Sequence, residues 1–445
     1  MQKILIANRG EIALRIIKTC HGMGIETVAI YSDADKEMPY VKAASKAVYV
    51  GEPPVTKSYL QVEKILAIAK DEKVDAIHPG YGFLSENSGF ALRTIEEGII
   101  FIGPEPKTLE LMGDKIVSRQ TMEHAGVPVV PGSAHGLKTL EEACSLAATI
   151  GYPIMLKASG GGGGIGMVLC ENEQALGKAY ASTKSRAMAY FGSDEVFIEK
   201  YIANARHVEI QVFGDIHGNI VHLYERDCSI QRRHQKVVEE SPSPFLSNEV
   251  REKMYDTAVK AAKAVDYKNA GTIEFIVDEQ ENFYFLEMNT RIQVEHPVTE
   301  EITGLDLVRW QILIAKGEKL PKVQSEITLE GHAIEFRLYA EDPVRFLPSP
   351  GKIATFEWES GQGVRVDAGY VSGGTITPFY DPMIAKCIFH GDSRDQALII
   401  AERFFKSLKI DGIKTNAPLF LKILANKDFK KGNYTTNFLT KQLIN

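Results

Sequence analysis

Residues 154–170 of the chain have the sequence IMLKASGGGGGIGMVLC. The two ends of this stretch, Ile154–Ala158 and Met167–Cys170, are apolar runs of strand length, and a loop rich in glycine joins them. The pattern predicts a hairpin of strand, glycine loop and strand. It differs from a Walker P-loop, which runs from a strand into a helix and closes with Gly-Lys-Ser/Thr.

Five consecutive glycines, among them Gly162, Gly163 and Gly164, favour the binding of phosphate groups. Without side chains, their backbone N–H groups can approach phosphate oxygens closely, and the loop can close as a lid that excludes water. Lys157, just before the loop, and Lys115 are candidates to pair with the same phosphates. The alternatives are a flexible connector for the loop and solvated surface charges for the two lysines.

The first hundred residues alternate short apolar runs with amphipathic ones. Strands are expected at Lys3–Ala7, Thr27–Tyr31, Ala76–His78 and Ile99–Ile102, and helices at Glu11–Cys20 and Tyr59–Lys70. This alternation is typical of a parallel sheet covered by helices, as in a Rossmann unit. The first turn, Asn8-Arg9-Gly10-Glu11, lacks the GxGxxG fingerprint, so we expect a scaffold and not a dinucleotide site.

The chemistry is expected between Gly113 and Gln324, and a mixed segment follows from Gly331. In that segment we expect strands near Ala333–Leu338, Ile353–Glu357 and Met383–Phe389, a turn at Leu347–Gly351 and a helix at Arg394–Leu408.

Two glutamates are expected to face each other in a second hairpin. The polar turn 279–282 separates two strand-like runs, and centring the turn places Glu274 directly opposite Glu287. Opposed carboxylates repel unless a cation lies between them, and Asn289, two residues further on the same face, adds a neutral oxygen. Such hard oxygen donors suit Mg²⁺ or Mn²⁺ bound together with phosphates. An ordinary acidic hairpin is the alternative, and a register slip of one residue would separate the pair.

Arg291, Gln293 and Glu295 occupy alternate positions along the chain. In an extended conformation all three side chains point the same way, so together they can clamp an anion and offer a base for its proton. Upstream, residues 226–236 are dense in Arg, His and Lys, which in an acidic protein favours an anionic substrate nearby. The alternative for this run is a solvated basic face.

Composition narrows the classes of protein. A chain of 445 residues suggests about three domains, and a net charge of −7 argues against a nucleic-acid binder. The five cysteines form no CxxC pair, which indicates reduced thiols without a disulfide frame or zinc site. No run approaches the length of a membrane span, and neither a secretory leader nor an organelle presequence is recognised, so a cytoplasmic location is expected.

Taken together, the motifs resemble those of biotin carboxylases. The resemblance rests on residues 6–13 (IANRGEIA), 78–87 (HPGYGFLSEN), 157–159 with the glycines that follow, 226–229 (RDCS), 231–239, 287–297 and 340–343 (AEDP). It extends over essentially the whole chain. One position departs from the family pattern, because Ile165 stands in the loop where an arginine is expected.

The resemblance implies a combined α/β and α+β fold with three domains. These are a Rossmann-like N-terminal domain (1–112), an ATP-grasp domain (113–327) with a glycine-rich lid (about 131–203), and a mixed C-terminal domain (328–445). Because the chain has no Met-Lys-Met biotinylation signature, biotin is expected on a separate carrier protein. Carboxyltransferase subunits and a second copy of the chain are the other expected partners, with no nucleic acid and no membrane.

The resemblance also implies roles for individual residues. It implies ATP contacts by Lys115, Lys157, Gly162, Gly163, Gly164, Glu199, Lys200, Ile202, His207, Gln231, His234, Glu274 and Glu287. It implies metal binding by Glu274, Glu287 and Asn289. Contacts with bicarbonate or biotin are implied for Lys236, Arg291, Gln293, Val294, Glu295, Arg337 and Tyr81, and Lys236, Arg291, Glu295 and Arg337 are expected to be catalytic.

The expected activity is ATP- and bicarbonate-dependent carboxylation of biotin through carboxyphosphate, with Glu295 as base and Arg337 stabilising the biotin enolate. The expected setting is an acyl-CoA or related carboxylase, acetyl-CoA carboxylase in fatty acid synthesis first among them. Two rivals are a carbamoyl-phosphate-type ATP-grasp ligase, which usually has a duplicated core, and a silent paralogue that binds ATP. The second rival is disfavoured because the charged catalytic candidates are all present.

Overall fold

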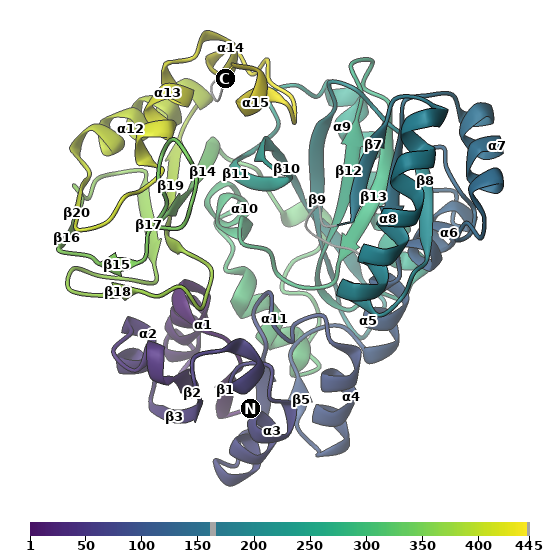
Figure 1. The fold of residues 1–445 in the computed structure, drawn as a ribbon. Helices are drawn as coiled ribbons and strands as arrows, with labels where there is room; N and C mark the ends of the chain where they lie inside the picture. Colours follow the sequence, from purple (N-terminus) through teal and green to yellow (C-terminus); the bar gives the residue numbers. More distant parts are fainter. Residues whose placement is uncertain (161–165, 443–445) are drawn as a thin grey trace.

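A computed structural model describes residues 1–160 and 166–442. Its N-terminal part is a five-stranded parallel sheet of order β3-β2-β1-β4-β5, flanked by helices (Figure 1). The strands are β1 (Lys3–Ile6), β2 (Glu26–Ser32), β3 (Lys46–Gly51), β4 (Ala76–His78) and β5 (Ile100–Phe101). The helices are α1 (Gly10–Gly22), α2 (Pro39–Ala43), α3 (Val62–Asp71) and α4 (Ser88–Glu96), and α5 (Pro106–Gly113) and α6 (Lys115–His124) lead into the middle of the chain.

The parallel sheet predicted for this part is confirmed, and the largest shift of a predicted boundary is at the start of α3. The helix expected from Tyr59 begins only at Val62. Tyr59 is instead fully buried, and its hydroxyl accepts a hydrogen bond from the Ser32 amide at 3.1 Å.

The N-terminus of α1 is covered by the C-terminal part of the chain. Gly369 lies so close that a Cβ there would come within 2.9 Å of the Glu11 nitrogen. Arg9 forms an ion pair with Asp35 at 2.7 Å, and its guanidinium lies 4.2 Å from the centre of the Tyr380 ring. This turn therefore joins two parts of the protein, which fits the scaffold role expected for it.

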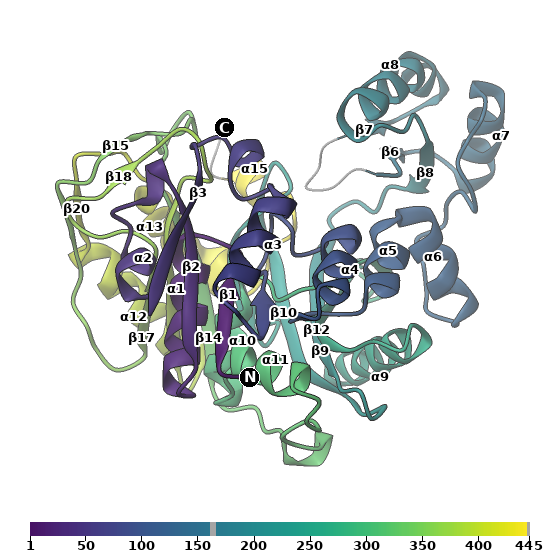
Figure 2. The same cartoon turned by 90° about the horizontal axis from the view of Figure 1, so that it is seen from below.

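A smaller three-stranded sheet, of order β7-β6-β8, projects from the rest of the molecule with helices α7 and α8 (Figure 2). Its elements are α7 (Leu140–Ile150), β6 (Ile154–Ala158), β7 (Met167–Cys170), α8 (Glu173–Phe191) and β8 (Val196–Lys200). The predicted hairpin is confirmed, because β6 and β7 pair antiparallel with Lys157 opposite Met167. The predicted phosphate-binding glycines Gly162, Gly163 and Gly164, and Ile165, lie outside the described residues.

An eight-stranded antiparallel sheet of order β13-β12-β9-β10-β11-β14-β19-β17 runs through the middle of the molecule and into the C-terminal part. Its strands are β9 (Arg206–Gly214), β10 (Ile220–Arg232), β11 (Gln235–Ser241), β12 (Asn269–Val277), β13 (Phe283–Asn289), β14 (His332–Tyr339), β17 (Val364–Ala368) and β19 (Met383–Gly391). Two short sheets pair β15 (Gly351–Lys352) with β18 (Thr375–Ile376) and β16 (Thr355–Glu357) with β20 (Lys409–Asp411).

The remaining helices are α9 (Asn248–Ala264), α10 (His296–Thr303), α11 (Leu307–Ala315), α12 (Arg394–Ser407), α13 (Ala417–Ala425), α14 (Lys427–Lys430) and α15 (Phe438–Gln442). One buried apolar cluster connects the parts, since it includes Ile16 of α1, Trp310 of α11 and Phe336 of β14. Within residues 1–160 and 166–442, no helix has both the length and the apolar character needed to cross a bilayer.

Candidate active site

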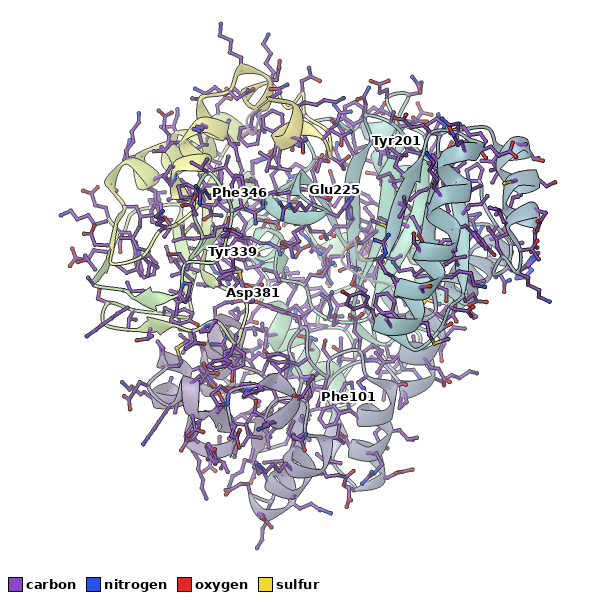
Figure 3. The ribbon with its side chains drawn as sticks, viewed as in Figure 1. Phe101, Tyr201, Glu225, Tyr339, Phe346 and Asp381 are labelled. Carbon is purple, nitrogen blue, oxygen red and sulfur yellow. The ribbon has the colours of Figure 1, made fainter. Side chains whose placement is uncertain are left out.

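A cavity of about 550 Å³ lies where the eight-stranded sheet and the C-terminal part meet the projecting lobe, which is the three-stranded sheet with α7 and α8. Tyr339 and Asp381, labelled in Figure 3, line it from the C-terminal side. The predicted site residues that line the cavity are Lys115, Lys157, Glu199, Lys200, Ile202, His207, Gln231, His234, Lys236, Glu274, Glu287, Asn289, Arg291, Gln293, Val294, Glu295 and Arg337. Tyr81 is not among the described residues of the lining, and its predicted contact with substrate stays a prediction.

A row of charged side chains crosses four neighbouring strands of the sheet. In the registers of the three strand pairs, Arg226 of β10 lies opposite Glu209 of β9, Glu209 opposite Glu274 of β12, and Glu274 opposite Glu287 of β13. The predicted pairing of Glu274 with Glu287 is therefore confirmed. The predicted register holds for Thr272–Glu274, which pair with Asn289–Glu287. Nearer the turn, Phe275 pairs with Phe285, so Leu286 is the extra residue of a β-bulge.

Lys236 of β11 neutralises much of this row. Its Nζ donates hydrogen bonds to Glu209 at 2.5 Å, Glu274 at 2.8 Å and Glu295 at 2.7 Å. Burial alone would lower the pKa of Lys236, but the three carboxylates outweigh burial and raise it well above its ordinary value. The ammonium therefore stays charged inside the protein and holds three acidic side chains within reach of one another.

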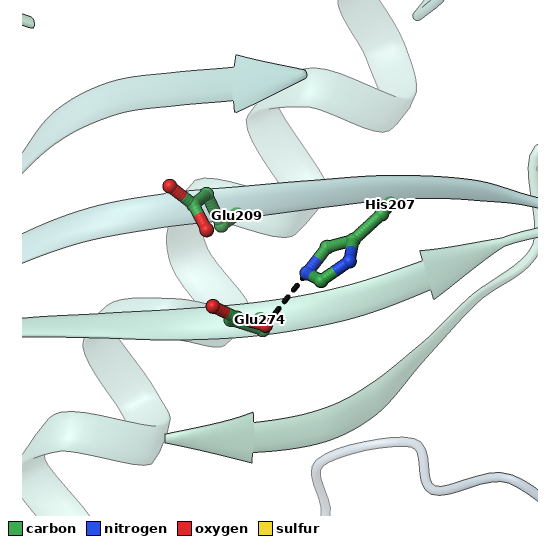
Figure 4. Close-up of side chains that lie close together, drawn as sticks. All are labelled: His207, Glu209 and Glu274. Atoms are coloured by element: carbon green, nitrogen blue, oxygen red, sulfur yellow. Dashed lines mark ion pairs between the residues drawn. The ribbon is translucent and has the colours of Figure 1, made fainter. Parts of the chain in front are cut away.

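His207 and Glu274 form a second contact in the same row. The His207 Nε2 atom lies 2.6 Å from a Glu274 oxygen, and Glu209 extends from the same strand as His207, two residues further along (Figure 4). Burial opposes ionisation of Glu274, yet Lys236 and His207 lower its pKa well below the ordinary value. Asn289 Nδ2 and Gln293 Nε2 each donate to Glu274 as well, at 2.8 and 2.7 Å.

The buried donor atoms around Glu274 fit a divalent cation. His207, Glu209 and Glu274 each place one donor atom within 4.8 Å of the others, and all three are buried. Glu287 and Asn289 line the same cavity and add oxygen atoms of the kind that Mg²⁺ and Mn²⁺ prefer.

Glu295 is the second centre of charge. Its Oε2 accepts a hydrogen bond from Arg337 at 2.9 Å, and Arg337 also lies 2.6 Å from Glu239. Burial would raise the pKa of Glu295, but Lys236, Arg337 and Arg226 outweigh it and hold the pKa well below its ordinary value. Glu295 is consequently an ionised carboxylate between two cations.

The expectation that Arg291, Gln293 and Glu295 lie in an extended run is wrong in its geometry. Strand β13 ends at Asn289, and the chain turns before α10, where Glu295 is the N-cap residue. The three side chains nevertheless line one cavity, because other side chains hold them there. Arg291 pairs with Glu86 at 2.8 Å, and Arg226 donates to Gln293 at 2.6 Å.

The basic run 226–236 is likewise not a solvated face. Arg226 is fully buried against Glu209 at 2.6 Å, and Arg232 donates to Glu341 at 2.8 Å. The exposed residues of this run are Arg233, His234 and Gln235, at and directly after the turn between β10 and β11.

The lobe side of the cavity carries the predicted nucleotide contacts. Lys157 ion-pairs with Glu199, which also accepts from Arg119 at 3.3 Å, and Lys115 lies 3.4 Å from Glu287. Apolar lining is supplied by Met155, Met167, Ile202, Ile276 and Leu286. Cations beside an apolar wall suit a ligand that has both phosphates and a flat ring.

Glu209 is the functional candidate that was not predicted. It is fully buried and touches both Arg226 and Lys236. The sequence contains a signal for it, because polar side chains alternate with aliphatic ones over residues 207–212 (HVEIQV).

Comparison with known proteins assigns the family. Residues 1–109 match the family described as Biotin carboxylase, N-terminal domain, residues 114–323 the Carbamoyl-phosphate synthase L chain, ATP binding domain, and residues 335–441 the Biotin carboxylase C-terminal domain. The chain is 58% identical over 441 residues to Biotin carboxylase 2 of Bacillus subtilis (strain 168), covering 99% of each chain. It is 49% identical over 439 residues to the 2-oxoglutarate carboxylase small subunit of Hydrogenobacter thermophilus, covering 98% of this chain and 93% of that one.

Solved structures agree with this assignment. The biotin carboxylase domain dimer of the Hydrogenobacter thermophilus 2-oxoglutarate carboxylase, in complex with MgADP, ADP and bicarbonate, superposes with a TM-score of 0.96 at 49% identity, covering 99% of this chain and 97% of that one. A biotin carboxylase complex from Campylobacter jejuni superposes with a TM-score of 0.97 at 46% identity, covering 99% of each chain. The two flanking matches separate the chain from the carbamoyl-phosphate-type ligases, and it belongs to the biotin carboxylase family of ATP-grasp ligases.

Proposed function

We propose that this protein uses ATP and bicarbonate to carboxylate biotin carried by a separate biotin carboxyl carrier protein. The observation that supports this most directly is the composition of the cavity. It joins the two lysines expected to bind phosphate, and a row of carboxylates, to a cluster in which Glu295 lies between Lys236 and Arg337. An anion can therefore be held and deprotonated next to a bound nucleotide.

Nucleotide binding is assigned to the lobe side of the cavity. Lys115, Lys157 and His234 would contact phosphates, and the glycine loop would cover them. The adenosine would lie by Glu199, Lys200, Ile202, His207 and Gln231. Glu274, Glu287 and Asn289 would hold Mg²⁺, which when bound neutralises charge on the phosphate oxygens.

Bicarbonate is assigned to the other side, among Lys236, Arg291, Gln293, Val294 and Glu295. In the free protein Lys236 and Arg337 keep the pKa of Glu295 low, after burial is overcome. A second anion that shares these two cations would weaken their hold on Glu295 and raise its pKa. Binding of bicarbonate would thus strengthen the base that removes its proton.

The proposed reaction has three steps, in which every bond broken is matched by one formed. Glu295 takes the proton of bicarbonate, the freed oxygen attacks the γ-phosphorus, and the bond to the ADP oxygen breaks, which gives carboxyphosphate and ADP. Carboxyphosphate separates into CO₂ and phosphate, and the phosphate takes the N1 proton of biotin. The biotin enolate, stabilised by Arg337, attacks CO₂ to form carboxybiotin.

Purified protein tests the assignment directly. With Mg–ATP and labelled bicarbonate it should transfer label to free biotin, and Glu295→Gln or Lys236→Ala should lower that rate by about 10²–10³-fold. Glu249→Gln is the control, because this exposed glutamate pairs with exposed Lys253 of the same helix, α9. Absence of label transfer by the unaltered protein would refute the function, and full activity of both variants would refute the site.

The proposal extends to the setting of the reaction. We infer three domains, with the bounds 1–112, 113–327 and 328–445, and a homodimer. We also infer that the carboxyl group passes from biotin to an acceptor on a separate carboxyltransferase, and acetyl-CoA is the expected acceptor. Relatives of similar identity are named for other acceptors, among them the 2-oxoglutarate carboxylase of Hydrogenobacter thermophilus and a pyruvate carboxylase of Methanothermobacter thermautotrophicus. Assays of the reconstituted complex with acetyl-CoA, propionyl-CoA, pyruvate and 2-oxoglutarate would decide among them.

A further inference from the structure

Lys386 of β19 is a buried cation behind the cavity wall. Its side chain has no exposed surface, and it is not one of the described residues that line the cavity. Its Nζ forms an ion pair with Oε2 of Glu11 at 3.0 Å and donates a hydrogen bond to the carbonyl oxygen of Val294, also at 3.0 Å. Val294 directly precedes Glu295.

The burial of this ammonium requires partners. An unpaired ammonium in a protein interior is strongly destabilising, so a lysine in such a place needs fixed acceptors around it. The acidic groups that face Lys386 come from three elements: Glu11 of α1, Asp367 of β17 and Glu335 of β14. Across the sheet Lys386 also lies in register with Arg337.

The segment that Lys386 contacts has no regular structure of its own. Residues 290–295 follow the end of β13 and precede α10, so side chains must hold them. The buried His296 Nδ1 atom lies 2.7 Å from the carbonyl oxygen of Gln293, and Lys386 holds the next carbonyl, that of Val294. Strands β14 and β19 thereby supply both Arg337, which contacts the Glu295 carboxylate, and Lys386, which contacts the backbone just before it.

We propose that Lys386, held in place by Glu11, is a positioning residue that fixes the Val294 carbonyl and so aims the Glu295 carboxylate into the cavity. This inference rests on the proposed function, since it concerns the base of that reaction. Because Glu11 holds Lys386, the N-terminal part of the chain influences the geometry of the base through this ion pair.

The test is a double variant, Lys386→Met/Glu11→Gln, which removes both charges of the pair. Asp367 keeps its ion pair with Arg365 at 2.7 Å, and burial holds the pKa of Glu335 well above its ordinary value, so the protein should fold and bind Mg–ADP with unchanged affinity. The donor to Val294 is gone, so kcat/KM for bicarbonate should fall by about 10²-fold, as expected for a small displacement of a catalytic group. The matched control, Arg251→Met/Glu225→Gln, removes another largely buried pair, 2.7 Å apart and outside the cavity lining, and should leave these kinetics unchanged.

The outcomes separate the two proposals. If the unaltered protein does not carboxylate biotin, the proposed function fails. If it does, and the double variant retains the wild-type kcat/KM for bicarbonate, the positioning role fails. Should the double variant not fold, Lys386→Arg decides, because it keeps the charge and moves the donor nitrogens: a lowered kcat/KM with unchanged Mg–ADP affinity supports positioning, and wild-type kinetics contradict it.

Discussion

Arg226 and Glu209 show how a fully buried ion pair supports the site at the scale of single residues. Neither side chain has exposed surface, and among residues 1–160 and 166–442 the other hydrogen-bond acceptors of Arg226 are neutral, namely Gln211, Thr272, Gln293 and Thr299. Glu209→Gln should therefore lower the free energy of unfolding by about 3–5 kcal/mol, because a buried charge loses its partner. Denaturant unfolding would measure this, with exposed Glu249→Gln as a control expected to stay near wild type. A small effect in both variants would contradict the assignment.

Glu239 gives a second residue-scale prediction, this one on pH. Burial raises its pKa to about 7, with Arg337 opposing the rise and Glu295 adding to it. A carboxyl group whose pKa is higher in the folded state stabilises the fold below its unfolded pKa, and this contribution is lost as pH rises through about 7. Wild-type protein should lose stability between about pH 5 and pH 8, and Glu239→Gln should remove that part of the slope. Thermal unfolding across this range would test it, and an identical slope in both proteins would contradict it.

At the scale of elements, strand β11 is tied to the C-terminal helices through one carboxylate. Glu240 accepts from Arg394 of α12 at 2.6 and 3.0 Å and from Tyr434 at 2.6 Å, and it contacts His332 at 2.6 Å. Burial would raise its pKa, but Arg394 and His332 lower it to about 2. The stability that Glu240 contributes is thus present at neutral pH and is lost as pH falls from its unfolded pKa towards 2.

Glu240→Gln should consequently destabilise the protein at pH 7 and matter much less near about pH 3. Urea unfolding at the two pH values would measure the difference between variant and wild type. An equal difference at both would show that the Glu240 charge is not what holds the C-terminal helices. Glu249→Gln, whose carboxylate is exposed, again serves as the control.

The elements themselves were largely predictable from local pattern. The glycine hairpin and the pairing of Glu274 with Glu287 follow from apolar runs and turn residues, which are short-range signals. The bulge at Leu286 was not predictable, because one extra residue in a strand leaves no mark in the local pattern. The turn after Asn289 was not predictable either, because it depends on partners distant in the sequence, such as Arg226. Candidate site residues came mostly from a family resemblance, and their ion partners, Glu209 above all, required the register of strands far apart in the sequence.

At the scale of the whole molecule, the eight-stranded sheet continues across the domain boundary expected from the sequence near residue 328. Strand β11 pairs with β14, so Lys236 and Glu239 come from one side of that boundary and Arg337 from the other. No local periodicity encodes such a long-range pairing. The charged cluster around Glu295 therefore exists only when the middle and C-terminal parts are joined, and α1 closes against the same C-terminal part.

The contact between Gly369 and α1 can be tested by adding one methyl group. In Gly369→Ala the new Cβ would lie 2.9 Å from the Glu11 nitrogen and 3.3 Å from the Gly10 carbonyl carbon, so the backbones of two distant segments must move apart. Such overpacking should cost about 1–3 kcal/mol of stability and lower Tm. It should also lower carboxylation, because Glu11 would shift relative to Lys386. Gly361→Ala is the matched control, since a Cβ there meets nothing within 4 Å. The prediction is contradicted if both variants unfold at the wild-type temperature and keep wild-type activity. In that case the junction between α1 and the C-terminal part accommodates a methyl group, and it does not couple the position of Glu11 to the cavity wall.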